Sequence, residues 1–275
     1  MIDLAGLSVR AISIGGLETC IEVPEYKLAF DIGRCPPSAI ARPTIFFTHA
    51  HMDHMGGVAA HAATRHLRGM PAPVYVVPTE YAEDFAALFE VWRRLDGAEI
   101  PCKIAPLAPG EDHALNPRLF ARPFSSPHRQ HCQGYGIWST KHKLRPEYTG
   151  LSHGELKELR DAGTEITERH DVPEIAFTGD TRIEVVEREE VVRTARRLVI
   201  ESTFIDDRVP IERCRETGHI HLDEIAERAD LFENEVILLT HFSARYKRAE
   251  ILQALDEKLP PGLRERVVPL LGGHS

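Results

Sequence analysis

Residues 44–56, Thr-Ile-Phe-Phe-Thr-His-Ala-His-Met-Asp-His-Met-Gly, restrict the possible folds of this chain more than any other stretch. The apolar and β-branched residues 45–48 predict a buried strand. Three imidazoles and a carboxylate follow within six positions, at His49, His51, Asp53 and His54. A single histidine beside an apolar run is usually packed or solvated, but four such side chains at one strand end predict a metal site.

The mixture of nitrogen and oxygen ligands is typical of zinc, whereas calcium and magnesium sites are mostly oxygen. Histidine and aspartate also accept manganese, so the ligand types leave that alternative open. Alternation places His49 and His51 on the same side of an extended segment, and a turn brings Asp53 and His54 to a neighbouring point. Because adjacent Asp and His side chains are hard to direct at one ion, we expect two ions side by side.

The chain of 275 residues is long enough for one sizeable α/β domain or two small ones. Its first six residues show neither the basic nor the apolar part of a signal peptide, and no run approaches the length of a membrane span. We therefore expect no membrane partner. The five cysteines are scattered without a C-x-x-C pair, so we expect reduced thiols and a cytoplasmic protein.

The net charge of −9 disfavours a general polyanion binder, because contact with phosphates normally requires a basic surface. One stretch departs from this balance, because no Asp or Glu interrupts the basic residues between positions 118 and 145. These are Arg118, Arg122, Arg129, Lys141, Lys143 and Arg145. A local basic face and an ordinary solvated charge run both explain this stretch.

Hydrophobic periodicity predicts an α/β protein in which strands and helices alternate in each half of the chain. Strands are expected at residues 8–14, 19–23, 27–30, 45–48, 74–77, 175–180, 198–201 and 236–240, and near residues 103, 119 and 136. Helices are expected at residues 56–68, 79–95 with Thr79 as N-cap, 221–232 and 244–258, with one more between residues 180 and 198. This order indicates a four-layered αββα sandwich whose strand ends converge on one site.

Residues 141–173 are polar and lack a continuous apolar face. They contain one capping box, Ser152-His-Gly-Glu155, ahead of Leu156 and Leu159. This pattern predicts a short helix on a protruding arm, at about residues 141–171, inserted within a single domain.

Two ions need more ligands than residues 49–54 supply. Asp180 follows a strand and a glycine, and its two carboxylate oxygens allow it to bridge two ions. His241 ends the apolar run 236–240, in the same position relative to its strand as His49. His128 follows an extended segment, but His131 lies three residues later and spacing alone does not distinguish the two.

Several motifs resemble those of the tRNase Z family, the tRNA 3′-processing endoribonucleases of the metallo-β-lactamase superfamily. They are Thr-His-Ala-His-Met-Asp-His-Met-Gly-Gly (48–57), Phe-Thr-Gly-Asp-Thr (177–181), Glu-Ser-Thr-Phe (201–204), Gly-His-Ile-His (218–221) and Thr-His-Phe-Ser-Ala-Arg-Tyr (240–246). The first motif marks only the superfamily, whereas Glu201, His219 and the segment from His241 to Tyr246 are typical of tRNase Z. The resemblance extends along nearly the whole chain and is strongest to the short plant form.

The resemblance implies two zinc ions per subunit. One is held by His49, His51, His128 and Asp180, with His128 selected over His131 by its distance from Gly134-Tyr135. The second is held by Asp53, His54, Asp180 and His241. Asp53 is also implied to be the general base, acting on a water whose pKa the metal lowers.

The implied reaction is hydrolysis of precursor tRNA next to the discriminator base, leaving a 3′-hydroxyl on the tRNA and a 5′-phosphate on the trailer. Glu201 and His219 correspond to the pair that supplies the acid for the leaving oxygen. Beyond the ligand His241, we expect Ser243, Arg245 and Tyr246 to contact substrate, with core packing as the alternative for Tyr246.

The segment at about 141–171 corresponds to the family's RNA-gripping arm, where Lys141, Lys143 and Arg145 are expected to meet phosphates. The resemblance also implies a homodimer. The alternative is a hydrolase of small phosphodiesters or thioesters with the same fold. Such an enzyme shares the metal ligands but needs neither the Glu201–His219 pair nor a basic arm.

Overall fold

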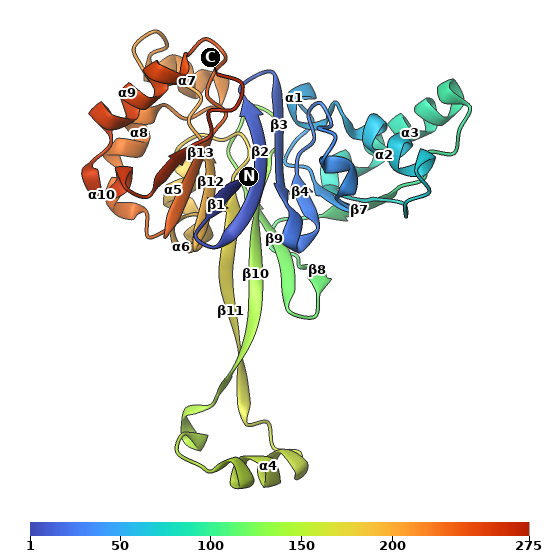
Figure 1. Ribbon diagram of the computed structural model, residues 1–275, viewed down its shortest axis with the longest axis vertical. Helices are drawn as coiled ribbons and strands as arrows, with labels where there is room; N and C mark the ends of the chain where they lie inside the picture. Colours follow the sequence, from blue (N-terminus) through green and yellow to red (C-terminus); the bar gives the residue numbers. More distant parts are fainter. Residues whose placement is uncertain (275) are drawn as a thin grey trace.

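Two seven-stranded β-sheets pack face to face at the centre of this computed structural model, which describes residues 1–274 (Figure 1). The first sheet contains, in order, β1 (Ile2–Leu4), β2 (Leu7–Ile14), β3 (Glu18–Val23), β4 (Leu28–Phe30), β5 (Thr44–Phe46), β6 (Val74–Pro78) and β7 (Lys103–Leu107). The second contains, in order, β14 (Val267–Pro269), β13 (Val236–Thr240), β12 (Arg197–Glu201), β11 (Thr167–Phe177), β10 (Gln133–Leu144), β9 (Leu119–Ser125) and β8 (His113–Asn116).

Helices cover the outer face of each sheet. The first sheet is covered by α1 (Met52–Met55), α2 (Val58–Leu67) and α3 (Ala82–Asp96). The second is covered by α5 (Glu184–Arg188), α6 (Glu190–Thr194), α7 (Ile211–Thr217), α8 (Leu222–Glu227), α9 (Arg248–Lys258) and α10 (Pro261–Arg264). The predicted four-layered αββα sandwich is therefore confirmed.

Three apolar layers hold these elements together, as expected when each sheet buries both of its faces. Between the sheets, Phe30 packs against Phe177 with ring centroids 4.9 Å apart, and Phe46 packs against Tyr135 at 5.0 Å. Phe85 on α3 belongs to the layer between the first sheet and its helices. The third layer lies between the second sheet and helices α5 to α10.

Parallel pairing aligns the strand ends that carry the polar motifs. Strands β4, β5 and β6 are mutually parallel in the first sheet, and β11, β12 and β13 are mutually parallel in the second. Since parallel strands end at the same edge of a sheet, the loops after β5, β11, β12 and β13 meet at one end of the sandwich.

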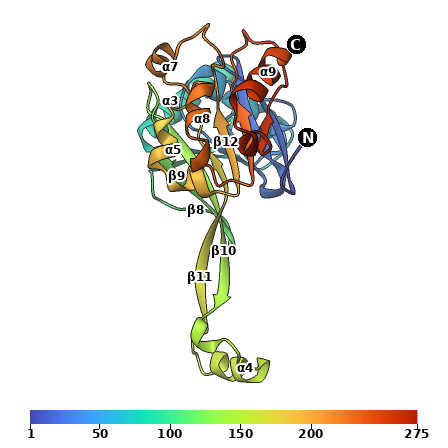
Figure 2. The ribbon, with the colours of Figure 1, turned by 90° about the vertical axis from the view of Figure 1, so that its left-hand side faces the viewer.

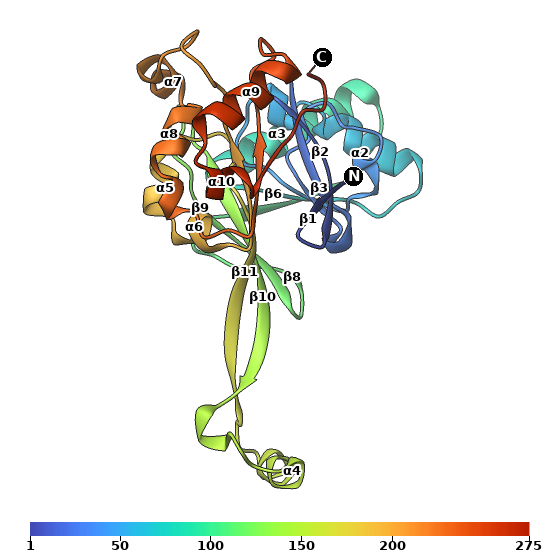
Figure 3. The same ribbon diagram turned by 60° about the vertical axis from the view of Figure 1, so that its left-hand side comes forward.

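An arm leaves the other end of the sandwich, away from α1 (Figure 1) and α7 (Figures 1 and 3). Its stem is the antiparallel pair β10–β11, which remains paired as far as Leu144 and Thr167. Its tip carries α4 (His153–Asp161), which Figure 2 shows clear of the body. Ser152 and Glu155 form the predicted capping box at the start of α4.

Two expected helix starts are wrong. Thr79 begins a 3-10 turn (Thr79–Tyr81), and α3 starts only at Ala82 without a side-chain cap. The last long helix starts at Arg248 instead of residue 244, because the preceding backbone is bonded elsewhere: the Ser243 amide donates to the Thr203 carbonyl. Within residues 1–274, no helix combines the length and the apolar composition that a membrane span requires.

Candidate metal centre

Seven imidazole and carboxylate side chains from four separate segments gather at the end of the sandwich where the parallel strands finish. His49 and His51 follow β5, Asp53 and His54 lie on the short helix α1, and His128 follows β9. Asp180 follows β11 and His241 follows β13. The structure therefore brings together all seven side chains named as candidate ligands from the sequence.

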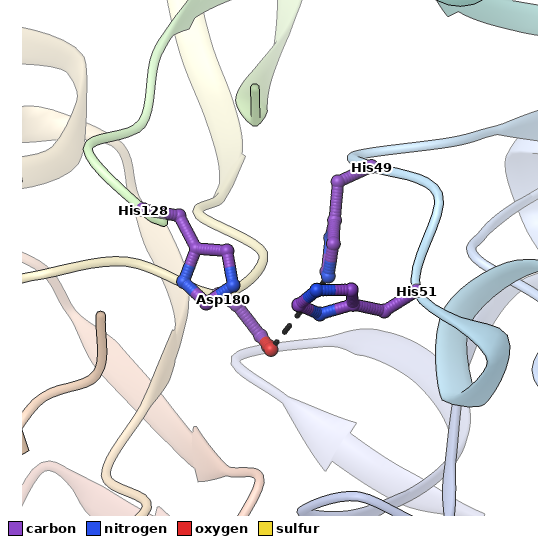
Figure 4. Close-up of side chains that lie close together, drawn as sticks. All are labelled: His49, His51, His128 and Asp180. Carbon is purple, nitrogen blue, oxygen red and sulfur yellow. Dashed lines mark ion pairs between the residues drawn. The ribbon is translucent and has the colours of Figure 1, made fainter. Parts of the chain in front are cut away.

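Four of these side chains form a first group: His49, His51, His128 and Asp180. One ligand atom from each lies within 4.8 Å of the others, and the side chains converge on one point in Figure 4. Nε2 of His49 is 3.8 Å from Oδ2 of Asp180. This spacing leaves room for an ion between the atoms without a direct hydrogen bond.

A second group consists of Asp53, His54 and His241, whose ligand atoms also lie within 4.8 Å of one another. Asp180 adjoins this group through its other oxygen, because Oδ1 is 3.2 Å from Nε2 of His54 and 3.4 Å from Nε2 of His241. The two oxygens of Asp180 thus face different groups, which is the arrangement a bridging carboxylate requires.

The histidine ring nitrogens fit metal ligation. Nε2 of His49, His54, His128 and His241 is buried and has no hydrogen-bond partner among the described residues. Buried polar atoms are rarely left without a partner, so a group that accepts the nitrogen lone pairs is expected at this point.

The other ring nitrogen of each of these histidines is fixed by a hydrogen bond. Nδ1 of His54 lies 2.8 Å from Oδ2 of Asp31, and Nδ1 of His128 lies 2.7 Å from the Gly218 carbonyl. Nδ1 of His49 and of His241 lie 3.0 and 2.9 Å from the hydroxyls of Thr48 and Thr203. Partners of this kind select the tautomer that directs an Nε2 lone pair at a metal.

The charge of the site also favours a cation. Burial lowers the pKa of His49, His51 and His128, which leaves their rings neutral and able to donate a lone pair. Burial also lowers the pKa of His54, but Asp180 and Asp31 outweigh this and raise it well above its ordinary value. Between these two carboxylates a positive charge is favoured, which His54 supplies as a proton on its ring when no metal ion is bound.

The backbone around two of the candidate ligands is unusual. His241 has φ of +62°, a left-handed conformation that is uncommon for a residue with a side chain and recurs at functional sites. Gly179 has φ of +61°, and a Cβ atom there would lie 2.7 Å from side-chain atoms of Thr48. Only glycine therefore fits the turn that presents Asp180.

Glu201 lies beside the metal cluster and accepts four hydrogen bonds. Its oxygens bind Nδ1 of His219 at 2.9 Å, the amides of Thr181 and Ile220 at 2.8 and 3.3 Å, and the hydroxyl of Thr203. These bonds fix the orientation of a carboxylate that is only 1% exposed.

His219 is placed by Glu201 at the edge of the cluster. Burial lowers the pKa of His219, but the Glu201 carboxylate, with help from Asp180, outweighs it and raises the pKa to about 9. Its ring stacks on that of His241 with centroids 5.4 Å apart, and its side chain is 16% exposed. A charged imidazole reachable from solvent can donate a proton at neutral pH.

The three residues expected to contact substrate after His241 are placed differently from one another. Arg245 is exposed, and its Nε donates to the Ser243 hydroxyl at 3.1 Å. Tyr246 is 2% exposed and packs in the core between the second sheet and its helices. We therefore withdraw Tyr246 as a substrate contact, because the alternative of core packing describes it.

The remaining candidates lie away from the cluster. His131 pairs with Glu80 at 3.1 Å, so His128 and not His131 joins the first group. Lys141 and Lys143 are exposed on the distal part of β10, and Arg145 pairs with Glu165 at 3.3 Å at the start of the arm tip.

Sequence reasoning missed Asp31, Thr48, Thr203 and Gly218, which orient the histidines through hydrogen bonds. Asp31 had a detectable signal, because it follows an apolar strand directly, as the candidate ligands do. The roles of Thr48 and Thr203 depend on contacts with other side chains that no local pattern marks.

Comparison with known proteins agrees with this geometry. A family model described as "Beta-lactamase superfamily domain" matches residues 33–242. The tRNase Z TRZ1 of Arabidopsis thaliana is 45% identical over 273 residues, which cover 98% of this chain and 97% of that protein. The chloroplastic tRNase Z TRZ2 of the same plant is 39% identical over 274 residues, or 99% of this chain and 77% of that protein.

A solved structure shares the fold. The short form of human tRNase Z superposes with a TM-score of 0.59 at 17% identity, covering 86% of this chain and 93% of that chain. At this identity the likeness concerns the fold alone. The family model and the two plant relatives show that this chain belongs to the tRNase Z family of the metallo-β-lactamase superfamily.

Proposed function

We propose that this chain is a metal-dependent endoribonuclease that removes the 3′ trailer from precursor tRNA. Hydrolysis next to the discriminator base leaves a 3′-hydroxyl on the tRNA and a 5′-phosphate on the trailer. The plant relatives named tRNase Z support this substrate. The observation that carries the proposal is the Glu201–His219 pair beside the metal cluster, because it supplies an acid for a poor leaving group.

Two zinc ions are the proposed cofactors, with manganese as a possible replacement. We assign His49, His51, His128 and Asp180 to the first ion, and Asp53, His54, Asp180 and His241 to the second. Two observations support this assignment: the ligand set is rich in nitrogen, and four buried Nε2 atoms have no hydrogen-bond partner among the described residues. When bound, the ions supply positive charge that lowers the pKa of an attacking water and stabilises charge on the phosphate.

Asp53 is the proposed general base. Burial raises the pKa of its carboxyl, but His241 and His54 outweigh this and lower it to about 2, so the group is ionised at neutral pH. The Gly16 amide donates to its Oδ2 at 3.0 Å and fixes its direction. An ionised carboxylate held in this way can accept a hydrogen bond from the attacking water and orient it.

His219 is the proposed general acid. Protonated and held by Glu201, it donates its proton to the 3′ oxygen of the tRNA as the bond to phosphorus breaks. Ser243 and Arg245 adjoin the same end of the sandwich, where the exposed guanidinium suits a substrate phosphate.

The arm is the proposed second contact with tRNA. Lys141 and Lys143 are exposed on its stem, whereas Arg145 is partly neutralised by Glu165. Lysines spaced along an exposed stem can contact a phosphate backbone without reading its sequence.

We further propose a homodimer that associates through α2 and α3. Apolar side chains are exposed on this face: Leu67 (86%), Leu88 (38%), Val91 (39%) and Leu95 (79%). Between the two helices runs a groove of about 380 Å³, lined mainly by Ala59, Ala60, Ala63, Trp92 and Leu95.

Charges on α3 favour a second copy as the partner on this face. Glu83 and Asp84 lie in its first turn, and Arg93 and Arg94 lie in its last. Antiparallel pairing of two α3 helices about a two-fold axis brings each acidic end against a basic end.

The cytoplasm is the proposed compartment. All five cysteines are free, which is typical of proteins kept in a reducing environment. Expression of the tagged full-length protein in its own cells tests this, and accumulation in an organelle would contradict it.

A cleavage assay with mapped ends tests the proposed function. Purified protein loaded with zinc should cut a 3′-extended precursor tRNA once, next to the discriminator base. Asp53→Ala serves as the control, and it should lose nearly all activity even with metal supplied. Equal activity on an unstructured RNA of the same 3′ sequence would instead support the alternative, a hydrolase of small phosphodiesters or thioesters with the same fold.

A further inference from the structure

The two halves of the molecule surround the metal cluster with the same hydrogen-bonding arrangement. In the first half, Asp31 is fully buried and accepts a hydrogen bond from Nδ1 of His54 at 2.8 Å. It also accepts one from the Thr48 hydroxyl at 2.9 Å, and that hydroxyl oxygen lies 3.0 Å from Nδ1 of His49. One carboxylate therefore orients one histidine directly and a second through a threonine.

The second half repeats this arrangement on different strands. Glu201 is 1% exposed and accepts a hydrogen bond from Nδ1 of His219 at 2.9 Å. It also accepts one from the Thr203 hydroxyl at 2.5 Å, and that hydroxyl oxygen lies 2.9 Å from Nδ1 of His241. Glu201 in the second half thus corresponds to Asp31 in the first, and Thr203 corresponds to Thr48.

The direction of these hydrogen bonds follows from the groups involved. An ionised carboxylate only accepts, so the single hydroxyl proton of Thr203 goes to Glu201. The Thr203 oxygen then accepts from Nδ1–H of His241, which leaves Nε2 of that ring unprotonated. This is the nitrogen that is buried without a partner among the described residues and faces Asp180.

The two arrangements differ in what the directly bound histidine does. In the first half, both His49 and His54 belong to the metal cluster. In the second half, His241 belongs to the cluster, whereas His219 is the acid assigned under the proposed function, on which this inference rests. We propose that Thr203 is a positioning residue whose hydroxyl couples the metal ligand His241 to the carboxylate that holds the acid His219.

A purely structural role for Thr203 makes different predictions. If the hydroxyl only satisfies its own hydrogen bonds, removing it lowers the stability of the protein. The activities on different substrates then fall by the same factor. A coupling role predicts that loss of the hydroxyl weakens metal binding through His241 and weakens proton donation through Glu201 and His219. Thr48 is the matched comparison, because its hydroxyl contacts the cluster histidine His49 and the carboxylate of Asp31, which holds another cluster histidine and no acid.

The test compares Thr203→Val, which removes the hydroxyl at nearly constant shape, with Thr203→Ser and Thr48→Val. Each metal-loaded variant is assayed on 3′-extended precursor tRNA and on a nitrophenyl phosphodiester, whose leaving group departs as a stable anion and needs no proton. Metal affinity is measured separately by competition with a chromophoric chelator. Circular dichroism and thermal melting confirm that each variant is folded.

We expect both valine variants to bind metal about 10- to 100-fold more weakly, as is typical for loss of a group that orients a ligand. Thr203→Val should in addition lower kcat on precursor tRNA about 100-fold more than on the nitrophenyl ester, since an acid contributes about 10²- to 10⁴-fold. Thr48→Val should lower both activities by the same factor. Thr203→Ser should restore both metal affinity and the ratio of activities.

A wild-type ratio of the two activities in folded Thr203→Val would overturn the inference, as would unchanged metal affinity. His219→Ala separates this failure from failure of the proposed function. If His219→Ala changes the ratio and Thr203→Val does not, the assignment of His219 as the acid is supported and the coupling through Thr203 is wrong. If neither variant changes the ratio, the assignment of His219 as the acid is wrong as well.

Discussion

Nδ1 of His54 donates a hydrogen bond to Oδ2 of Asp31 over 2.8 Å, between two side chains that are both at most 1% exposed. A carboxylate outside the metal cluster thus orients a histidine inside it. We predict that Asp31→Asn lowers metal affinity about 10- to 100-fold, because the orientation and basicity of His54 depend on this bond. Chelator competition measures the change. Asp112→Asn, at an exposed carboxylate paired with Arg122, is the control and should leave affinity unchanged.

The lysines on the arm stem predict a measurable salt dependence. The double variant Lys141→Ala, Lys143→Ala should bind precursor tRNA more weakly at low salt. The slope of log affinity against log salt should fall by about 1 to 2, because each lost phosphate contact releases about one counterion fewer. Lys103→Ala, at an exposed lysine outside the arm, is the control. A slope identical to that of the wild type would show that these lysines do not contact the tRNA phosphates.

The apolar face of α2 and α3 predicts that association between copies depends on Leu95. This side chain is 79% exposed and lines the groove between the helices. Leu95→Glu should convert a dimer to a monomer in sedimentation velocity, since association buries a charge without a partner. Leu231→Glu, at an exposed leucine outside this face, should stay dimeric. Dimers that persist in Leu95→Glu would place the interface elsewhere.

His61 predicts how stability depends on pH. Burial, with a smaller contribution from Arg65, lowers its pKa from 6.5 to about 4. Its ring is neutral and bonded to the Tyr75 hydroxyl and the Ala39 carbonyl. The unfolded chain therefore binds a proton between about pH 4 and 6.5 that the folded protein excludes, so the stability due to His61 is complete above that window and lost as pH falls through it.

Over this pH window, the free energy of unfolding should fall by about 3 kcal/mol because of His61, for a pKa shift of this size. Chemical unfolding of metal-free protein, which avoids metal release, should show the wild type losing that much more stability than His61→Gln on acidification. Parallel pH profiles for the two proteins would contradict the assigned pKa.

Much of the site could be predicted because its residues carry local signals. His49, His51, Asp53 and His54 are contiguous in the chain, and their spacing after an apolar run predicts clustering without knowledge of the fold. Asp180 and His241 follow strands in the same way, so parallel pairing brings them to the same edge.

Other features could not be predicted because they depend on contacts distant in the sequence. Thr203 meets His241 across 38 positions, and nothing in its immediate neighbourhood identifies that partner. Tyr246 was expected near substrate because it follows a ligand histidine, but its ring turns into the core. The start of α9 was misplaced because hydrogen bonds to neighbouring segments hold residues 242–246 out of the helix, including one from the Gly15 amide to the Phe242 carbonyl.

The count of metal ions bound per chain tests the central claim most directly. Elemental analysis of protein equilibrated with excess zinc and freed of loosely bound metal should give two ions per chain, and His241→Ala should give fewer. Two ions are expected because Asp180 presents one oxygen to each group of histidines. Fewer than two ions in fully loaded, folded wild-type protein would contradict the paired metal centre.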